Sequence, residues 1–393
     1  MDVIIWDWLS FAMRLLHVVT AIAWIGSSFY FIAMDLGLRQ RQGLAQGVGG
    51  EAWQVHGGGF YYIQKYLSAP DSMPADLTWF KWESYMTWLS GFFLLFMVYY
   101  AGAELFLIDR TVLDISPLQG AGIGIVGLAS GWLVYDLLCR SILGKKDMAL
   151  LAVLFVFVLL AGWAFTQVFS GRGAFVHIGA LIASIMTGNV FFVIIPNQKI
   201  VVADLLAGKT PDPALGKQAK QRSTHNNYLT LPVVFLMLSN HIPLAFASQW
   251  NWLIVAFVLI AGAMIRHFFN TMHAHKERPW WCLIVAALCF GVIVWLSSFS
   301  PAAKLDESAK VDKQEVYDLV AGRCAMCHAA QPAWEGLSGP PKGVALETPA
   351  DIERHARLIY MQAGRSSAMP PGNIIELEPE ERALIVAWFE AGR

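Results

Sequence analysis

Residues 148–169 read MALLAVLFVFVLLAGWAFTQVF, and no charged side chain interrupts them. An α-helix needs about 20 predominantly apolar residues to cross the hydrocarbon core of a bilayer, because it rises about 1.5 Å per residue. A helix in a soluble core seldom has so long a run without one polar face. The segment therefore predicts a membrane-spanning helix.

Seven further apolar runs flank this one. They occupy residues 8–36, 85–108, 121–143, 174–203, 228–247, 252–269 and 280–299. The first run is too long for a removable signal peptide and lacks a basic leader and a small-residue cleavage site, so we interpret it as a retained anchor. We therefore expect an all-α fold, a polytopic membrane helix bundle of about eight transmembrane helices.

The composition supports this interpretation. Of 393 residues, 56% are hydrophobic and only 15% are charged, whereas soluble domains carry about 25% charged residues. A net charge of −1 gives no sign of a surface that binds polyanions. We expect the lipid bilayer as a partner and no nucleic acid.

Basic residues collect in alternate loops. They are Arg39, Arg41, Lys65 and Lys81; Arg140, Lys145 and Lys146; Lys209, Lys217, Lys220 and Arg222; and Lys276 and Arg278. The opposite connections hold little beyond Arg110 and Arg172. Because short cytoplasmic loops are enriched in Lys and Arg, eight spans would leave both termini outside. We expect a multi-pass protein of the bacterial inner membrane, with everything after Ser300 in the periplasm.

The chain changes character after the last apolar run. Residues 301–313 are polar and are predicted to form a linker. Residues 314–393 have helical patterns at both ends, over 314–324 and 379–391, around a middle rich in Gly and Pro. We expect three parts: a membrane domain over 1–300, the linker, and a small domain over 314–393.

Residues 324–328 of this small domain read Cys-Ala-Met-Cys-His. This is the attachment motif of a c-type haem: the thiols of Cys324 and Cys327 add to the two porphyrin vinyl groups, and the imidazole of His328 reaches the iron from the same side. A zinc half-site or a chance pentapeptide is the alternative. The predicted periplasmic location favours covalent haem.

A methionine follows about forty residues later, within Ser-Ser-Ala-Met-Pro-Pro-Gly-Asn at residues 366–373. Met369 is our candidate for the second axial ligand, and Met361 is the less favoured substitute; a loop methionine that fills a core gap is the alternative. His/Met ligation raises the reduction potential and suits an electron acceptor. We therefore predict a class I-like cytochrome c domain with one covalent haem c.

Ionisable residues inside the predicted spans are functional candidates, because burying them in lipid is costly. Arg14 and His17 share one face of the first helix, and His177 and His241 fall in the same outer leaflet. This set would either supply axial ligands to a b-type haem or bind and deprotonate an anionic heterocycle. The alternative is a set of histidines that bond neighbouring helices.

A second cluster lies on the predicted cytoplasmic side. It comprises residues 53–62, residues 224–228, His267, His273 and His275. Three glycines follow His56 and would let the backbone approach a flat ligand closely. A flexible loop with interfacial aromatic residues is the alternative. The two clusters compete as the active site.

Several of these segments together resemble the membrane-bound, cytochrome c-linked urate oxidases of bacteria. They are LHVVTAIAWIG at residues 16–26, HGGGFY at 56–61, residues 225–235 and Ser-Asn-His at 239–241. The resemblance covers essentially the whole chain, including the C-terminal cytochrome motif.

The resemblance implies that urate loses two electrons and gains water to give 5-hydroxyisourate, without hydrogen peroxide. Electrons would pass singly through the haem to a soluble cytochrome c or a terminal oxidase. A histidine would take the urate proton, and an arginine would hold the developing anion. Arg14 and His17 are our first candidates, His56 is next, and His177 and His241 complete the set.

Two rival functions remain at this point. A non-enzymatic electron-relay subunit of a respiratory complex would have a b-haem ligand pair across helices and no substrate pocket. A haem-handling or metal-transport protein would share the His-to-Trp-x-Gly pattern of the first helix, but would have little use for a fused cytochrome.

Overall fold

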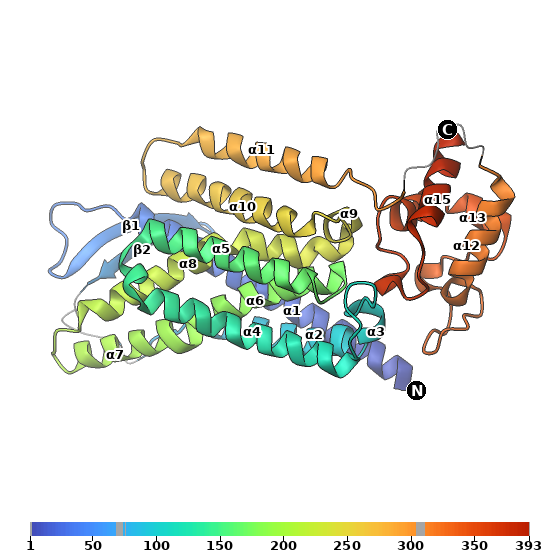
Figure 1. Cartoon of the computed structure of the whole chain (residues 1–393). Coiled ribbons are helices and arrows are strands. Elements are labelled where there is room, and N and C mark those ends of the chain that lie inside the picture. The colour runs from blue at the N-terminus through green and yellow to red at the C-terminus, as the bar shows by residue number, and fades with distance from the viewer. Residues whose placement is uncertain (1, 68–73, 75, 304–310, 393) are drawn as a thin grey trace.

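The computed structural model describes residues 2–67, 74, 76–303 and 311–392. It is mostly helical, as predicted. A long bundle of helices makes up one part, and a smaller helical unit at the C-terminus lies at one end of that bundle (Figure 1). The N-terminal end of the first helix lies at the same end of the bundle as this unit (Figure 1).

The bundle contains all eight predicted apolar runs as helices. Its elements are α1 (Asp2–Gly37), α2 (Trp82–Leu95), η1 (Phe96–Tyr100), α3 (Ala103–Phe106), α4 (Pro117–Arg140), η2 (Ile142–Lys145), α5 (Asp147–Thr166), α6 (Gly171–Gly188), η3 (Asn189–Ile194), α7 (Ile195–Leu206), α8 (Pro213–Leu238), η4 (Ser239–His241), α9 (Pro243–Phe246), α10 (Asn251–His273) and α11 (Trp280–Leu296). Among the described residues, five helical stretches are long and apolar enough to cross a membrane: α1, α4, α5, α10 and the continuous helix α6–η3–α7. These are compatible with a membrane protein, and eight spans stay a prediction.

The expectation of an all-α chain was wrong for residues 48–66. Strands β1 (Val48–His56) and β2 (Gly59–Tyr66) pair as an antiparallel hairpin at the end of the bundle away from the C-terminal unit (Figure 1). Gly57 and Gly58 form its two-residue turn with φ values of +59° and +80°, which glycine adopts at little cost. The glycines after His56 therefore make a tight turn.

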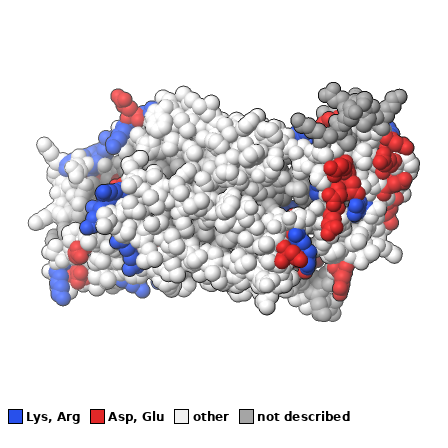
Figure 2. Space-filling view, in the orientation of Figure 1, with Lys and Arg blue, Asp and Glu red and all other residues white. Residues whose placement is uncertain are grey.

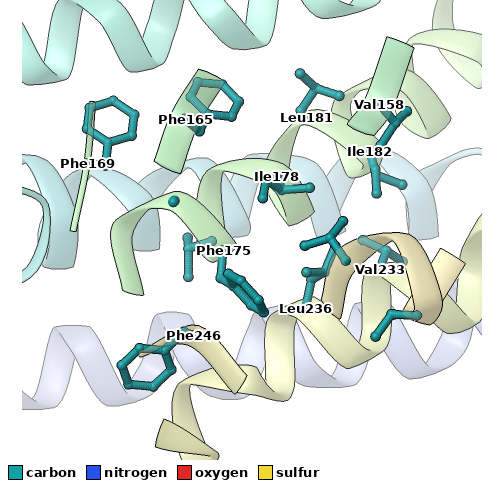
Figure 3. Close-up of a cluster of buried hydrophobic side chains, with 14 of the residues drawn as sticks. Val158, Phe165, Phe169, Phe175, Ile178, Leu181, Ile182, Val233, Leu236 and Phe246 are labelled. Atoms are coloured by element: carbon teal, nitrogen blue, oxygen red, sulfur yellow. The ribbon is translucent and has the colours of Figure 1, made fainter. Parts of the chain in front are cut away.

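Helix α6 is the centre of the bundle. Its buried side chains include Phe175, Ile178, Leu181 and Ile182, and Figure 3 shows them packed among residues of α5 and α8. A helix that is apolar on all sides belongs inside a larger structure. Helices α2, α4, α5 and α8 therefore pack around α6.

Charged residues are confined to the two ends of the molecule in the view of Figure 2, which shows a broad uncharged belt between them. Basic side chains gather at the hairpin end and acidic side chains dominate at the C-terminal unit (Figure 2). This is the charge pattern that a bilayer around the belt would select.

The C-terminal unit has its own hydrophobic core. Its elements are α12 (Lys313–His328), η5 (Pro341–Gly343), α13 (Pro349–Arg354), α14 (Ala356–Ile359), η6 (Tyr360–Gly364), η7 (Pro371–Asn373) and α15 (Pro379–Ala391). Val316 and Val320 of α12 pack with Ile385 and Trp388 of α15 in this core. The two terminal helices thus hold together the irregular middle.

Candidate functional site

The Cys-Ala-Met-Cys-His motif forms the last turns of α12. Cys324 packs against the core of the C-terminal unit, and so does Met369. Burial, followed by the neighbouring Cys327, raises the pKa of the Cys324 thiol to about 11. His328 donates from Nδ1 to the carbonyl oxygen of Val344 at 2.7 Å, which leaves Nε2 for a metal. A backbone acceptor on the second ring nitrogen is the usual arrangement around an iron-binding histidine, so this donor set fits a haem.

The loop that carries Met369 is held by a buried arginine. Arg382 is 4% exposed and donates to the carbonyl oxygens of Ala363 at 2.7 Å and Met369 at 3.0 Å. It also donates to Asn373 Oδ1 at 3.0 Å. These bonds hold the backbone before and at Met369 and the side chain of Asn373 after it, so Arg382 is a positioning residue for Met369.

The same loop docks on the end of the helical bundle. Ala368 belongs to the buried core of the bundle, while the adjacent Met369 packs in the C-terminal unit. Ser367 donates from Oγ to the carbonyl oxygen of Ala247 at 3.2 Å. A small cleft beside this contact is lined by Ser367, Ser170 and Arg172. The candidate iron ligand Met369 therefore lies directly at the junction.

His177, a predicted site residue, is fully enclosed in the half of the bundle next to the C-terminal unit, which the sequence predicts to be the outer half. Its Nδ1 donates to Gly173 O at 2.8 Å, and its Nε2 lies 3.2 Å from the hydroxyl of Tyr100. Phe169 packs against the ring with its plane tilted by 37° and a centroid distance of 4.6 Å. A Cβ on Gly124 would come within 2.6 Å of Nε2. Both ring nitrogens lie within hydrogen-bond distance of a partner, so His177 links α6 to Tyr100 of η1.

His17 presents a different geometry. Its Nδ1 donates to Thr87 O at 3.0 Å and lies 3.2 Å from Ser90 Oγ on α2. Gly91 permits this approach, because a Cβ there would lie 2.8 Å from the imidazole. Within the described part of the chain, Nε2 has no hydrogen-bond partner. His17 is thus oriented through one nitrogen and free at the other.

Two arginines in the same half lack a carboxylate within ion-pair distance among the described residues. Arg14 is exposed and Arg172 is half-buried, and both interact electrostatically with Tyr99. The hydroxyl of Tyr99 donates to Asn240 Oδ1 at 2.9 Å. The neighbouring His241 is exposed. The outer half therefore combines uncompensated positive charge with a buried phenol.

His56, the remaining predicted site residue, lies away from these groups. It is exposed at the end of β1, next to the hairpin turn. Its side chain makes no hydrogen bond with any residue that the structure describes. The structure thus does not bring His56 together with Arg14 or His17.

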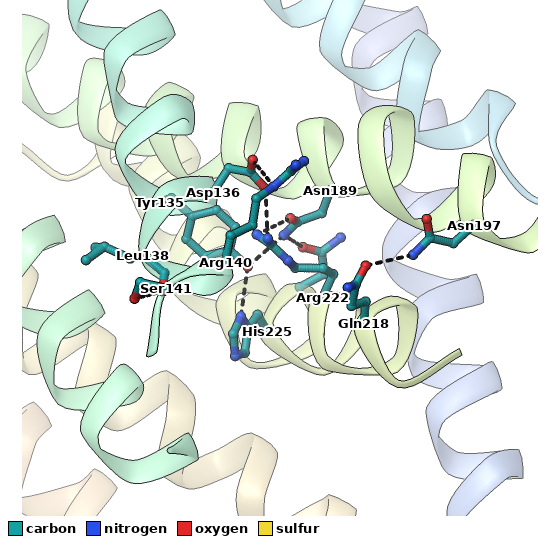
Figure 4. Close-up of polar contacts among 11 residues, drawn as sticks. Tyr135, Asp136, Leu138, Arg140, Ser141, Asn189, Asn197, Gln218, Arg222 and His225 are labelled. Atoms are coloured by element: carbon teal, nitrogen blue, oxygen red, sulfur yellow. Dashed lines mark hydrogen bonds and ion pairs between the residues drawn. The ribbon is translucent and has the colours of Figure 1, made fainter. Parts of the chain in front are cut away.

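Residues 225–228 of α8 form the middle of a polar layer in the other half of the bundle. His225 Nδ1 lies 2.8 Å from the hydroxyl of Tyr135. Asn189 donates to the same hydroxyl and to Asn226 Oδ1, both at 2.9 Å. Figure 4 shows Tyr135, Asn189 and His225 converging from three helices. This layer ties α4, α6–η3 and α8 together.

A buried ion pair neutralises one arginine of this layer. Arg222 is 3% exposed and donates from Nη2 to Asp136 Oδ1 at 2.7 Å. On the surface side, Arg140 Nε lies 2.7 Å from the other carboxylate oxygen of Asp136 (Figure 4). The charge of Arg222 is therefore compensated within the protein.

Arg266 of α10, which sequence reasoning did not single out, has no such compensation. It is 4% exposed, and within the described residues its guanidinium donates only to amide oxygens, those of Asn227 at 3.2 Å and Asn270 at 3.0 Å. Phe29 of α1 covers the guanidinium at 3.8 Å from the ring centroid. Asn227 Nδ2 and His273 Nδ1 are buried without a partner among the described residues. The sequence signal was an arginine inside the apolar run 252–269.

The geometry defines a helical protein with membrane-length apolar helices, a polar interior and a separate C-terminal helical unit. Residues 3–297 match the family model described as urate oxidase N-terminal, so the chain belongs to that family. It is therefore an oxidoreductase-type enzyme related to urate. A search of curated proteins and a search of solved structures each returned no match.

Proposed function

We propose that the protein is a membrane-bound, cytochrome c-linked urate oxidase. Urate and water give 5-hydroxyisourate, two electrons and two protons, and the electrons leave one at a time through a haem c in the C-terminal unit. The observation that carries this proposal is the junction: the Met369 loop packs on the end of the bundle that matches the urate oxidase family.

The C-terminal residues have distinct tasks in this proposal. Cys324 and Cys327 would hold the haem covalently, and His328 and Met369 would bind its iron. The bound haem supplies a one-electron acceptor, whose potential His/Met ligation raises. Arg382 keeps the methionine in place through the carbonyl oxygen of Met369. Because a single haem takes one electron, each urate needs two successive transfers.

The outer half of the bundle supplies groups for the oxidation itself. Arg14 and Arg172 are cations without a carboxylate within ion-pair distance in the described chain, and urate is an anion at neutral pH. His17 has an unbonded Nε2 in the same half of the bundle, suited to accept the proton that urate releases. These groups lie toward the end of the bundle that carries the C-terminal unit, which keeps the electron path short.

The electron-relay function is the second candidate, because the free Nε2 of His17 would equally suit a b-type haem. Such a relay would need a second ligand opposite His17. No other histidine ring contacts His17 in the described residues. We therefore favour a role for His17 in proton transfer.

Isotope labelling tests the proposed reaction. Turnover in H₂¹⁸O under ordinary O₂ should place one ¹⁸O atom in 5-hydroxyisourate and give no hydrogen peroxide. Label from ¹⁸O₂, or one peroxide per urate, would contradict the proposal. The natural electron acceptor, a soluble cytochrome c or a terminal oxidase, is then found by adding each to the turnover mixture.

A further inference from the structure

Helices α1, α8 and α10 enclose a group of hydrogen-bond donors around Arg266. The amide oxygen of Asn227 accepts three hydrogen bonds, two from Arg266 and one from Asn270 Nδ2. Its amide nitrogen has no acceptor among the described residues. The hydrogen bonds of Arg266 come from Nε and Nη2, and Nη1 makes none with the residues that the structure describes. The group therefore contains hydrogen-bond donors without acceptors, together with the positive charge of Arg266.

Arg222, another buried arginine of the bundle, does not have this excess of hydrogen-bond donors. Arg222 is equally buried, but its partner is the carboxylate of Asp136. Arg266 has no acidic residue within 4 Å in the described parts of the chain. Because an unpaired charge inside a membrane domain is strongly unfavourable, a group of this kind is completed by an anion from outside.

The shape of the group selects a flat anion. Phe29 covers one face of the guanidinium, and arginine offers parallel donors in one plane. His273 lies two turns after Arg266 on the same face of α10 and adds an unbonded Nδ1.

We propose that these donors around Arg266 form a pocket that binds the urate anion, which enters from the hairpin end of the bundle. The inference rests on the proposed function. Arg266 lies seven residues, or about 10 Å, from the end of α10 at His273, but about 22 Å along the helix from Asn251 at the junction end. The groups proposed for oxidation lie in the other half of the bundle, so this pocket binds urate before it is oxidised.

The sharpest test is Asn227→Asp, which is nearly isosteric and gives Arg266 the carboxylate that it lacks. Asn197→Asp is the matched control, because it makes the same change at an amide that contacts Gln218 outside the pocket. Urate binding is measured by equilibrium dialysis on anaerobic protein with reduced haem, which prevents turnover. We expect Asn227→Asp to weaken binding about ten-fold or more, as loss of one charge-assisted bond does, and the control to bind as wild type does.

Kinetics of haem reduction complete the test. Asn227→Asp and Arg266→Gln should raise KM for urate and leave kcat within about two-fold of wild type, and Arg266→Lys should partly restore KM. Wild-type binding by Asn227→Asp and Arg266→Gln, or a lower kcat at unchanged KM, would overturn the inference. A wild-type protein that binds urate in this pocket without oxidising it would overturn the proposed function and leave the pocket intact.

Discussion

Gly372 of the Met369 loop lies against the backbone carbonyl of Ile108 in the bundle, where a Cβ on residue 372 would come 2.3 Å from the oxygen. Its φ of +57° is also one that side chains rarely adopt. This contact joins the C-terminal unit to the bundle by backbone alone. In our account, electrons cross the molecule here.

Gly372→Ala should therefore loosen the junction. The left-handed conformation alone costs about 1–2 kcal/mol, roughly a ten-fold shift in docking, and the clash adds to it. We expect normal covalent haem but slower reduction of the haem by urate in stopped-flow absorbance. Gly339→Ala is the control, since nothing lies within 4 Å of its Cβ. Equal rates in both variants would show that docking is not needed for transfer.

Met369→Ala should retain covalent haem but lower its reduction potential, because a His/Met pair favours the reduced iron. Potentiometric titration measures this directly. Met361→Ala is the control and should keep the wild-type potential. A drop in the Met361 variant alone would transfer the ligand role to Met361.

Covalent attachment through Cys324 and Cys327 predicts how the haem behaves on extraction. Acid acetone should remove no haem from the wild-type protein, and the pyridine haemochrome should give one haem c per chain. Cys324→Ala and Cys327→Ala together should abolish covalent haem. Extractable haem that disappears in His17→Ala would instead favour the electron relay with a b-type haem.

The buried pair of Arg222 and Asp136 should matter for stability far more than its surface extension. Asp136→Asn leaves a buried guanidinium unpaired and should lower the free energy of unfolding by about 3–5 kcal/mol. Arg140→Gln removes a mostly exposed partner, 64% accessible, and should cost less than about 1 kcal/mol. Thermal unfolding in detergent micelles compares the two. Similar losses would mean that solvent reaches the inner pair.

The helices were predictable where hydropathy alone determines them, and less so where charge or a turn intervenes. The run predicted at 228–247 begins in the structure at Pro213, because Asp212 caps a helix whose first turns carry basic residues. A prediction based on hydropathy leaves these charged turns out of the helix, although their residues have good helix propensity. The hairpin was missed because the glycines after His56 were assigned to ligand approach, although Gly57 and Gly58 between alternating residues also signal a two-residue turn.

The candidate sites divide in the same way. The motif at 324–328 has fixed spacing, and local sequence is enough to predict it. His177 was predicted as a site residue because it is ionisable and lies within a predicted span. Its two hydrogen bonds depend on how the helices pack, which the sequence alone does not determine. Arg266 was overlooked, and Asn227 was named only as part of the cluster at residues 224–228, because the significance of both lies in the partners that they lack. Such an imbalance is visible only after the helices have been packed.

The most direct test of the central claim is the haem spectrum after urate is added to oxidised protein without oxygen. Our account predicts that the c-type absorption bands of the reduced haem appear, with two haems reduced for each 5-hydroxyisourate formed. A haem that stays oxidised with urate but is reduced by a quinol would contradict the account and identify the protein as a respiratory electron relay.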